Sequence, residues 1–150
     1  MIHKKATAEW SGNLSGGKGS FSYGKERPVT QPYSFNSRFE DENGTGPEDL
    51  IAAAHAACYS MALSHLLNEE GFHPERVLTA ADVSLAENGE GPSVRSSHLH
   101  TTVLCPEMEK PVLDKLASAA AENCPVSKAL AGVDISVEAE LMDSRGELGV

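Results

Sequence analysis

Three cysteines are the residues of this chain best suited to covalent chemistry: Cys58, Cys105 and Cys124. Their number is odd and their spacings are long, so they form neither a C-x-x-C pair nor a zinc-ribbon motif. In a reducing compartment such cysteines are either inert core residues or reactive thiols. Because the thiolate is the reacting form, a reactive member needs a neighbour that favours ionisation.

The neighbours of Cys58 in sequence are histidines. His55 lies one helical turn earlier and His65 two turns later, and the three fall on one stripe of a helix. Their spacing matches no standard zinc motif, so we expect hydrogen-bonded histidines and no bound metal. A hydrolase pair of Cys58 and His55 is a further alternative, but both side chains project from one helix and no oxyanion hole is evident.

The helix that carries Cys58 is predicted to run from Pro47 to about Glu70, with Gly71 as its C-terminal stop. Between Leu50 and Leu67 it is apolar or small on nearly every side, which is typical of a helix that is buried nearly all round. A chain of this length has little material to surround such a helix. We therefore expect a second copy of the protein to cover part of it, and the alternative is a central helix in a monomer.

The remaining pattern predicts an α+β fold, with three strands, a helix, two strands, a helix and a strand in order. One domain spans residues 1–142, and residues 143–150 are expected to form a flexible tail. Pro106-Glu107 is expected to open the second helix, and Asn123-Cys124-Pro125 to break it before a short helix through Leu130. The expected strands are residues 6–10, 19–23, 33–39, 77–85, 99–105 and 133–141.

Charge and composition exclude several classes of function. Lys and Arg number 12 against 22 Asp and Glu, for a net charge of -10, so nucleic acid is an unexpected partner. Polar residues interrupt the longest apolar stretch, so we expect no membrane span. Charged residues near the N-terminus are followed by no apolar run, so we expect no secretory signal and a cytoplasmic location.

Two motifs that occur together extend this interpretation. The first is GTGPEDLIAAAHAAC at residues 44–58, preceded by RFE at 38–40, and the second is NCPVSKAL at residues 123–130. With these motifs the chain resembles the OsmC/Ohr superfamily, the osmotically inducible protein C and organic hydroperoxide resistance proteins. IHKK at residues 2–5 and QPYSFN at 31–36 resemble the OsmC branch in particular. The likeness covers residues 2 to 141.

This resemblance implies a fold in which strands wrap around long central helices and two chains intertwine as a homodimer with two shared active sites. It implies a thiol peroxidase of oxidative and osmotic stress defence that reduces organic hydroperoxides. Cys58 would attack the peroxide, Cys124 would resolve the product as a disulfide, and Arg38 and Glu48 would flank the attacking thiol. It implies a dithiol reductant, often a lipoyl group carried on a protein, and no cofactor.

The chemistry fits these residue types. Free cysteine has a pKa of about 8.5, and a guanidinium such as that of Arg38 favours the thiolate. Glu48 would orient Arg38, yet it lies ten residues before Cys58 on one predicted helix, about 15 Å along the axis. If Glu48 serves Cys58, it should come from the other subunit.

Plainer interpretations remain open for each of these residues. Arg38 would be a solvated charge, Glu48 would only stabilise a helix dipole, and Cys124 would merely precede a helix. Cys105 ends an apolar alternation and is expected to be core. At the level of the whole protein, the alternative function is a redox-sensing or binding protein that uses the same disulfide as a signal.

Overall fold

The computed structural model describes residues 1–40, 43–143 and 145. Within it the chain forms two compact units, Met1–Asp49 and Leu50–Val150, which are described here one at a time. Most of the tail expected at residues 143–150 lies outside the described residues.

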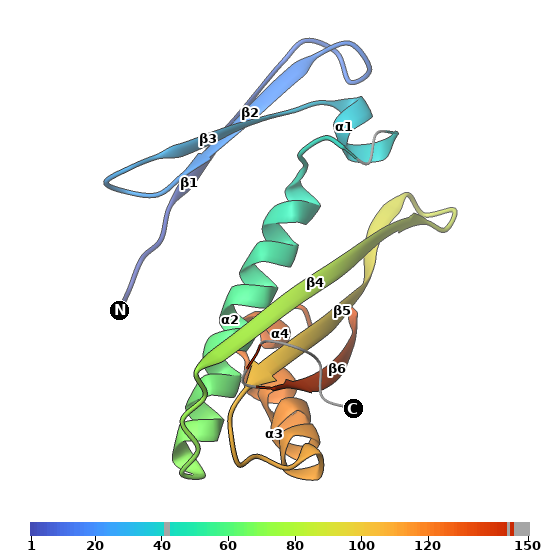
Figure 1. The fold of residues 1–150 in the computed structure, drawn as a ribbon. Helices are drawn as coiled ribbons and strands as arrows, with labels where there is room; N and C mark the ends of the chain where they lie inside the picture. The colour runs from blue at the N-terminus through green and yellow to red at the C-terminus, as the bar shows by residue number, and fades with distance from the viewer. Residues whose placement is uncertain (41–42, 144, 146–150) are drawn as a thin grey trace. The chain divides into compact units, whose positions relative to one another are not determined.

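The first unit is a three-stranded antiparallel meander followed by a short helix (Figure 1). Tyr33 packs against Trp10 and Phe21, with ring centroids 5.5 Å and 5.6 Å away. A Cβ on Gly19 would lie 2.6 Å from the Tyr33 ring and 2.7 Å from the Trp10 ring, so only glycine fits between them. The elements are β1 (Ala6–Ser11), β2 (Lys18–Tyr23), β3 (Val29–Tyr33) and α1 (Phe35–Phe39).

The prediction of a strand at residues 33–39 was wrong, because β3 ends at Tyr33 and α1 begins at Phe35. Ser34 caps this helix. Its hydroxyl accepts from the Ser37 backbone N–H at 3.1 Å, and the Ser37 hydroxyl accepts from the Ser34 N–H at 2.8 Å. This reciprocal capping box satisfies two free backbone donors and starts a helix where the residue pattern indicated a strand.

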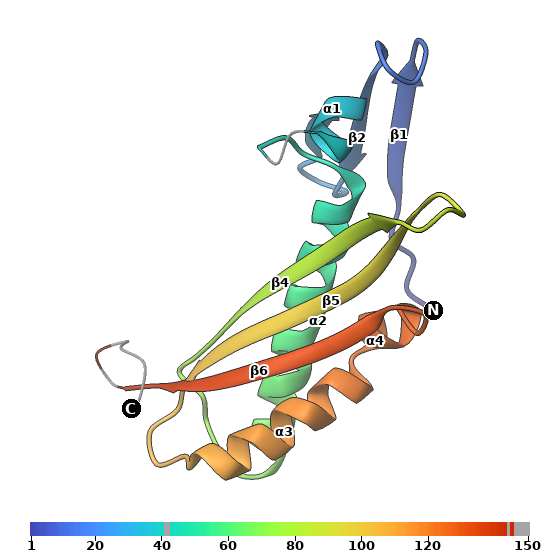
Figure 2. The ribbon, with the colours of Figure 1, turned by 90° about the vertical axis from the view of Figure 1, so that its right-hand side faces the viewer.

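The second unit packs helices on a mixed three-stranded sheet of order β4-β5-β6 (Figure 2). Strands β4 and β5 form a long antiparallel hairpin, whereas β6 runs parallel to β5 after a helical crossover. The strands expected at 77–85 and 133–141 are confirmed to within two residues, whereas the strand expected at 99–105 begins seven residues earlier, at Pro92. The elements are α2 (Pro47–Glu69), β4 (Arg76–Glu87), β5 (Pro92–Leu104), α3 (Lys110–Asn123), α4 (Pro125–Ala129) and β6 (Asp134–Met142).

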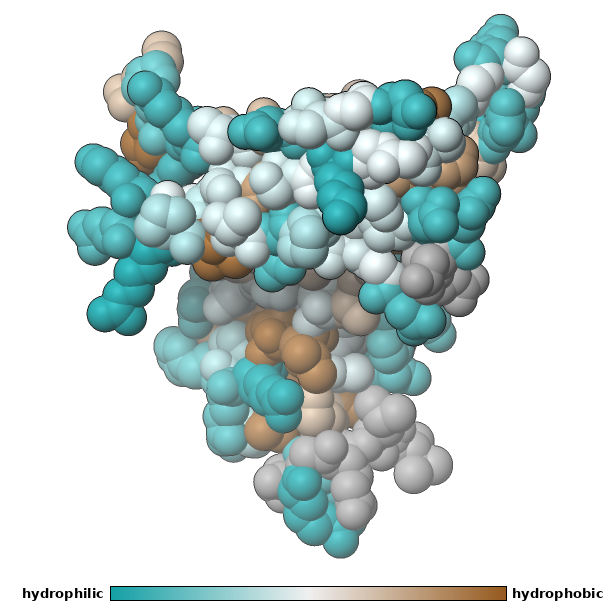
Figure 3. Space-filling view, turned by 90° about the horizontal axis from the view of Figure 1, so that it is seen from above, coloured by the Kyte–Doolittle hydropathy of each residue, from teal (hydrophilic) through white to brown (hydrophobic). Residues whose placement is uncertain are grey.

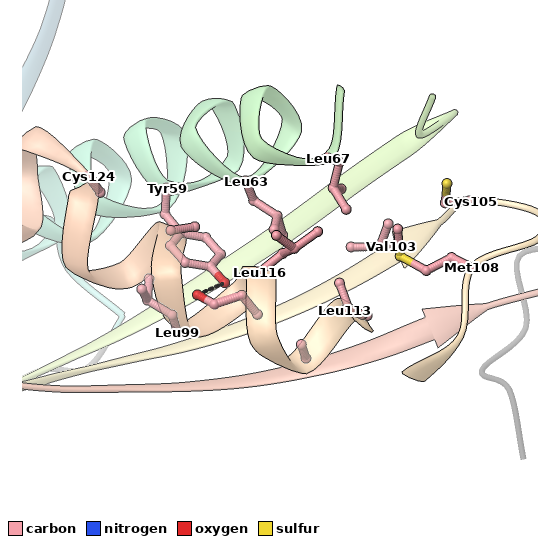
Figure 4. Packing of buried hydrophobic residues seen from close by; sticks show 13 residues of the cluster. Tyr59, Leu63, Leu67, Leu99, Val103, Cys105, Met108, Leu113, Leu116 and Cys124 are labelled. Carbon is pink, nitrogen blue, oxygen red and sulfur yellow. Dashed lines mark hydrogen bonds between the residues drawn. The ribbon is translucent and has the colours of Figure 1, made fainter. Parts of the chain in front are cut away.

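The core of this unit lies between α2, α3 and the sheet (Figure 4). Fully buried leucines come from each layer, and the Tyr59 hydroxyl donates to the Ala117 carbonyl at 3.1 Å, which joins α2 to α3. Along β5 the inward positions alternate with outward ones, as period two requires. The inward side chains of β5 are Ser97, Leu99, Thr101 and Val103.

Helix α2 ends as predicted. Gly71 has a φ of +87°, its N–H bonds to the Asn68 carbonyl, and the Phe72 N–H bonds to the Leu67 carbonyl. This pair of bonds is a Schellman motif, for which glycine is the favoured residue. By length and composition alone α2 would also be long and apolar enough to cross a membrane, a test that core helices of globular proteins pass too.

Helix α3 begins later than expected. Glu107 has a φ of +71°, which no helix accommodates, and the first helical residue is Lys110, followed by Pro111. Proline is well tolerated in the first turn because the N–H that it lacks would have no partner there. The predicted break between α3 and α4 at Cys124 is confirmed.

Candidate functional site

Two of the three thiols, those of Cys58 on α2 and Cys124 between α3 and α4, lie close enough for each to shift the pKa of the other. Both are free thiols. Their accessibility differs, because Cys58 is half-buried whereas Cys124 is 0 % exposed. A reagent from solvent therefore reaches Cys58 first, because Cys124 has no surface accessible to solvent.

The backbone around Cys124 explains its position. Cys124 ends α3, where its N–H bonds to the Ala120 carbonyl at 2.9 Å, and it is also the N-cap of α4. Pro125 takes the first position of α4 because it needs no N–H there. The sharp corner turns the side chain of Cys124 inward toward α2, where it joins the core.

The surroundings shift the pKa values of the two thiols in opposite directions. Burial raises the pKa of Cys58, and the hydrogen-bonding interaction with Cys124 raises it further. Burial also acts to raise the pKa of Cys124, but hydrogen bonds from the Ser127 N–H, the Cys58 thiol, the Ser127 hydroxyl and the Val126 N–H outweigh it and lower that pKa. The surroundings in this protomer therefore favour the thiolate on Cys124 more than on Cys58.

A cation near Cys58 would reverse this order, since an opposite charge favours the ionised form. Among the residues of Leu50–Val150 that the structure describes, no lysine or arginine acts on the Cys58 thiol. The cation that the sequence predicts for this thiol is thus not supplied by the unit that contains it.

His55 lies beside the thiol pair and is completely buried. Its Nδ1 is 2.7 Å from the Ser97 hydroxyl on β5, and its Nε2 is 2.8 Å from the Ser127 hydroxyl on α4. Burial lowers the pKa of His55, so the ring is neutral near pH 7. Both ring nitrogens are occupied by serines, which leaves neither as a base for Cys58 in the hydrolase alternative.

The two serines were missed from the sequence. Ser97 holds an inward position of β5 among apolar residues, and a polar side chain on a buried face is the signal that could have identified it. Ser127 follows Cys124 by three residues, the spacing at which a side chain reaches back to an N-cap residue. Their common partner is separated from both by long stretches of chain, so no local pattern predicts the contact.

Arg38 and Glu48 meet within the first unit. The Arg38 Nη2 is 2.7 Å and its Nε 3.1 Å from Glu48 Oε1, so the guanidinium presents two donors to one carboxylate. The Ser37 hydroxyl donates to the Thr45 carbonyl at 2.8 Å, which brings the chain after α1 back beside it. The Glu48 side chain is 16 % exposed and that of Arg38 is 36 % exposed, so the guanidinium keeps an open side.

Other candidates lie apart from the thiol pair. His65 is exposed and is 3.5 Å from Glu69 on the same helix, so the proposed stripe of His55, Cys58 and His65 does not act as one cluster. Cys105 is buried in the core, where burial raises its pKa. Among the described residues no group of three His, Cys, Asp or Glu side chains is placed to hold a metal ion.

Comparison with known proteins identifies the family. Residues 40–138 match the model of the family described as OsmC-like protein. The chain belongs to the OsmC-like family. It is 46 % identical over 129 residues to Peroxiredoxin OsmC of Escherichia coli (strain K12), covering 86 % of this chain and 90 % of that protein. It is 31 % identical over 104 residues to the organic hydroperoxide resistance protein OhrB of Bacillus subtilis (strain 168), covering 69 % and 75 %.

Solved structures of the OsmC-like family share the fold. An OsmC-like protein of unknown function from Vibrio cholerae superposes with a TM-score of 0.74 at 18 % identity, covering 93 % of this chain and 99 % of that one. The crystal structure of Bacillus subtilis OhrB superposes with a TM-score of 0.67 at 25 % identity, covering 91 % and 98 %. The expected α+β, OsmC-like fold is therefore confirmed.

Proposed function

We propose that this OsmC-like protein is a thiol peroxidase that reduces organic hydroperoxides to alcohols. The observation that carries the proposal is the closeness of a half-buried thiol, Cys58, to a fully buried one, Cys124, within one core cluster. The accessible sulfur meets the peroxide, and the buried sulfur is in place to close a disulfide with it. The names of the relatives in Escherichia coli and Bacillus subtilis support the same class of reaction.

The reaction has three balanced steps. The Cys58 thiolate attacks one peroxide oxygen, the O–O bond breaks, and the alkoxide takes up a proton and leaves as an alcohol, with Cys58 oxidised to a sulfenic acid. The Cys124 thiolate then attacks the sulfur of Cys58. An S–S bond forms, the S–O bond breaks, and hydroxide leaves and is protonated to water. A dithiol reduces the disulfide by exchange and becomes a disulfide itself.

The first step needs a thiolate on Cys58, which the isolated protomer disfavours. We propose that the guanidinium of Arg38 supplies the missing positive charge and that Glu48 orients it through their paired contacts. Since α2 is continuous from Pro47 to Glu69, Glu48 lies about 15 Å along the axis from Cys58 of the same chain. The Arg38–Glu48 pair that serves a given Cys58 therefore comes from the partner subunit.

A homodimer with shared sites also accounts for the exposed apolar side chains of α2. Leu50 is 36 % and Met61 77 % exposed in the protomer, and Ala53, Ala54 and Ala57 are exposed between them. Apolar residues reach the surface among polar ones in the space-filling view (Figure 3). A row of alanines lets a second helix approach closely, so we propose that a second copy of this chain covers the face.

The substrate and reductant follow from the same surroundings. Apolar side chains of α2 such as Met61 would line the approach to Cys58 beneath the second copy, and they suit the organic part of a hydroperoxide better than they suit hydrogen peroxide. We propose a dithiol as reductant, such as a lipoyl group on a carrier protein, because one disulfide must accept two electrons at each turnover. The reaction needs no bound cofactor, and a cytoplasmic location would keep the thiols reduced.

Stopped-flow mixing with cumene hydroperoxide tests the proposal. The wild-type protein should consume peroxide far faster than free cysteine does, and Cys58→Ser should abolish the fast phase. Cys105→Ala is the matched control and should retain the phase. A wild-type rate equal to that of free cysteine would reject the peroxidase and favour the redox-sensing or binding alternative.

A further inference from the structure

A series of buried, hydrogen-bonded polar side chains leads away from the thiol pair, and the three proposed steps name none of them except Cys124. It begins at Cys124, passes through the Ser127 hydroxyl to His55, and ends at Ser97. His55 is 0 %, Ser97 0 % and Ser127 6 % exposed. Buried polar groups are costly unless each finds a partner, so the residues of this series are expected to keep their hydrogen bonds to one another.

The first link follows from the helix geometry. Cys124 is the N-cap of α4 and Ser127 is its third residue, so both side chains lie in the first turn of this short helix. The Ser127 hydroxyl lies near enough to the Cys124 sulfur to lower the pKa of that thiol. The second and third links are the contacts of His55, at 2.8 Å to Ser127 and 2.7 Å to Ser97.

Donor and acceptor counting allows two arrangements of this series. In the first, the Ser97 hydroxyl donates to Nδ1 of His55, Nε2–H donates to Ser127, and the Ser127 hydroxyl donates to a Cys124 thiolate. In the second, the Cys124 thiol donates to Ser127, whose hydroxyl donates to Nε2, and Nδ1–H donates to Ser97. Each serine hydroxyl has one proton, so the tautomer of a neutral His55 and the ionisation of Cys124 change together.

We propose that His55 and Ser127 form a hydrogen-bond relay that holds the Cys124 sulfur as an acceptor, which makes them positioning residues for the thiol that closes the disulfide; this inference rests on the proposed peroxidase function. The relay acts on the second step of the reaction, in which the Cys124 thiolate attacks the oxidised sulfur of Cys58. The titratable groups that face Cys124 are Cys58 and Tyr59 on α2. His55 is connected to Cys124 through the Ser127 hydroxyl. The groups that bond to His55 are the hydroxyls from β5 and α4.

Two substitutions of His55 distinguish its hydrogen bond to Ser127 from its hydrogen bond to Ser97. The amide of His55→Gln places its nitrogen near the position of Nε2 and can still donate to Ser127. The shorter His55→Asn places its nitrogen near Nδ1, so it reaches Ser97 and leaves Ser127 without a donor. Ser127→Ala removes the link to Cys124 directly. Ser60→Ala is the matched control, because it removes one hydroxyl and one 2.8 Å bond between α2 and the sheet, to Thr79.

The first measurement uses no peroxide. In a Cys58→Ser background, the ultraviolet thiolate absorbance that is lost with Cys124→Ser gives the pKa of Cys124. A hydrogen bond to a charged group accounts for about one pH unit, so Ser127→Ala and His55→Asn should raise that pKa by about one unit. His55→Gln and Ser60→Ala should leave it near the parent value. If Ser127→Ala does not fold, the two His55 variants carry the same comparison.

The second measurement follows disulfide formation after one equivalent of cumene hydroperoxide, in protein that retains Cys58 and Cys124. A rise of about one unit in the pKa of Cys124 lowers its thiolate fraction about tenfold but makes the thiolate a stronger nucleophile. His55→Asn should therefore slow disulfide formation about threefold. The preceding attack by Cys58 should keep its rate. An unchanged Cys124 pKa in both Ser127→Ala and His55→Asn would overturn the relay, as would equal slowing of both steps. Absence of peroxide reduction in the wild type would instead reject the proposed function, because the pKa measurement stands apart from it.

Discussion

The half-buried thiol of Cys58 and the fully buried thiol of Cys124 lie close enough for each to shift the pKa of the other. The pair joins the middle of α2 to the corner at which α3 ends. The proposed disulfide would therefore join two elements that already lie together in the core of the second unit. Burial and hydrogen bonding raise the pKa of Cys58 and lower that of Cys124, and this difference can be tested.

Replacing Cys124 should separate attack from recycling. Cys124→Ser keeps Cys58 and should react once with cumene hydroperoxide, after which a sulfenic acid accumulates and excess peroxide oxidises it irreversibly. Intact-protein mass spectrometry would show the added oxygens, whereas the wild type would lose only two hydrogens as its disulfide forms. Full turnover of Cys124→Ser with a dithiol reductant would contradict the resolving role.

Replacing Arg38 should move the pH dependence of the first step. If this guanidinium favours the Cys58 thiolate, Arg38→Met should shift the midpoint of the peroxide reaction upward by about one unit or more. Arg38→Lys keeps the charge but loses the two-donor contact with Glu48, so its shift should be smaller. The measurement is the pH profile of the fast stopped-flow phase. Identical profiles for wild type and Arg38→Met would exclude the assignment.

Mixed dimers should reveal which chain supplies Glu48. When Glu48→Ala and Cys58→Ser subunits are combined, a shared site reunites one intact Glu48 with one intact Cys58, and activity should recover to about half of wild type per heterodimer. The reverse control combines wild type with the Glu48→Ala/Cys58→Ser double variant. If the sites are shared, each site of this heterodimer contains one replaced residue, so the heterodimer should be inactive. No recovery in the first mixture, together with half activity in the second, would place both residues in one chain.

The pattern of residues predicted much of this fold, and the failures have physical causes. The strand around Val137 was evident because apolar and polar residues alternate along it, and the apolar face is half-buried or buried in the structure. The helix at Phe35 was missed because two serine hydroxyls, Ser34 and Ser37, decide it, and a hydrophobic pattern does not register a cap. The contacts of His55 were not predictable, since they join residues that only the folded chain brings together.

Acid should destabilise the protein through His55. Burial lowers the pKa of this imidazole in the folded state, so below about pH 6.5 the unfolded chain binds a proton that the folded chain does not. The free energy of unfolding should therefore fall as the pH drops below that value, down to the folded-state pKa. His55→Gln should show a flatter profile in urea titrations. His65→Gln, which removes an exposed ring, is the control, and equal slopes for His55→Gln and wild type would refute the prediction.

Leucines on neighbouring strands should differ in their contribution to stability. Leu99 on β5 is 0 % exposed, whereas Leu78 on β4 is 50 % exposed. Leu99→Ala should lower the free energy of unfolding by about 2–5 kcal/mol, because it leaves a cavity between sheet and helices. Leu78→Ala should cost less than about 1 kcal/mol, as surface changes usually do. Urea denaturation of the reduced proteins would measure both, and equal losses would contradict the burial pattern.

The corner at Cys124 has a mechanical consequence. One residue ends α3 and begins α4, so a covalent bond made there constrains two helices at once and, through Cys58, a third. A crosslink that closes so long a stretch of chain can stabilise a protein by about 4 kcal/mol. Each catalytic cycle would then alternate between a looser and a tighter form of the same unit, and the reductant would have to open the tighter one.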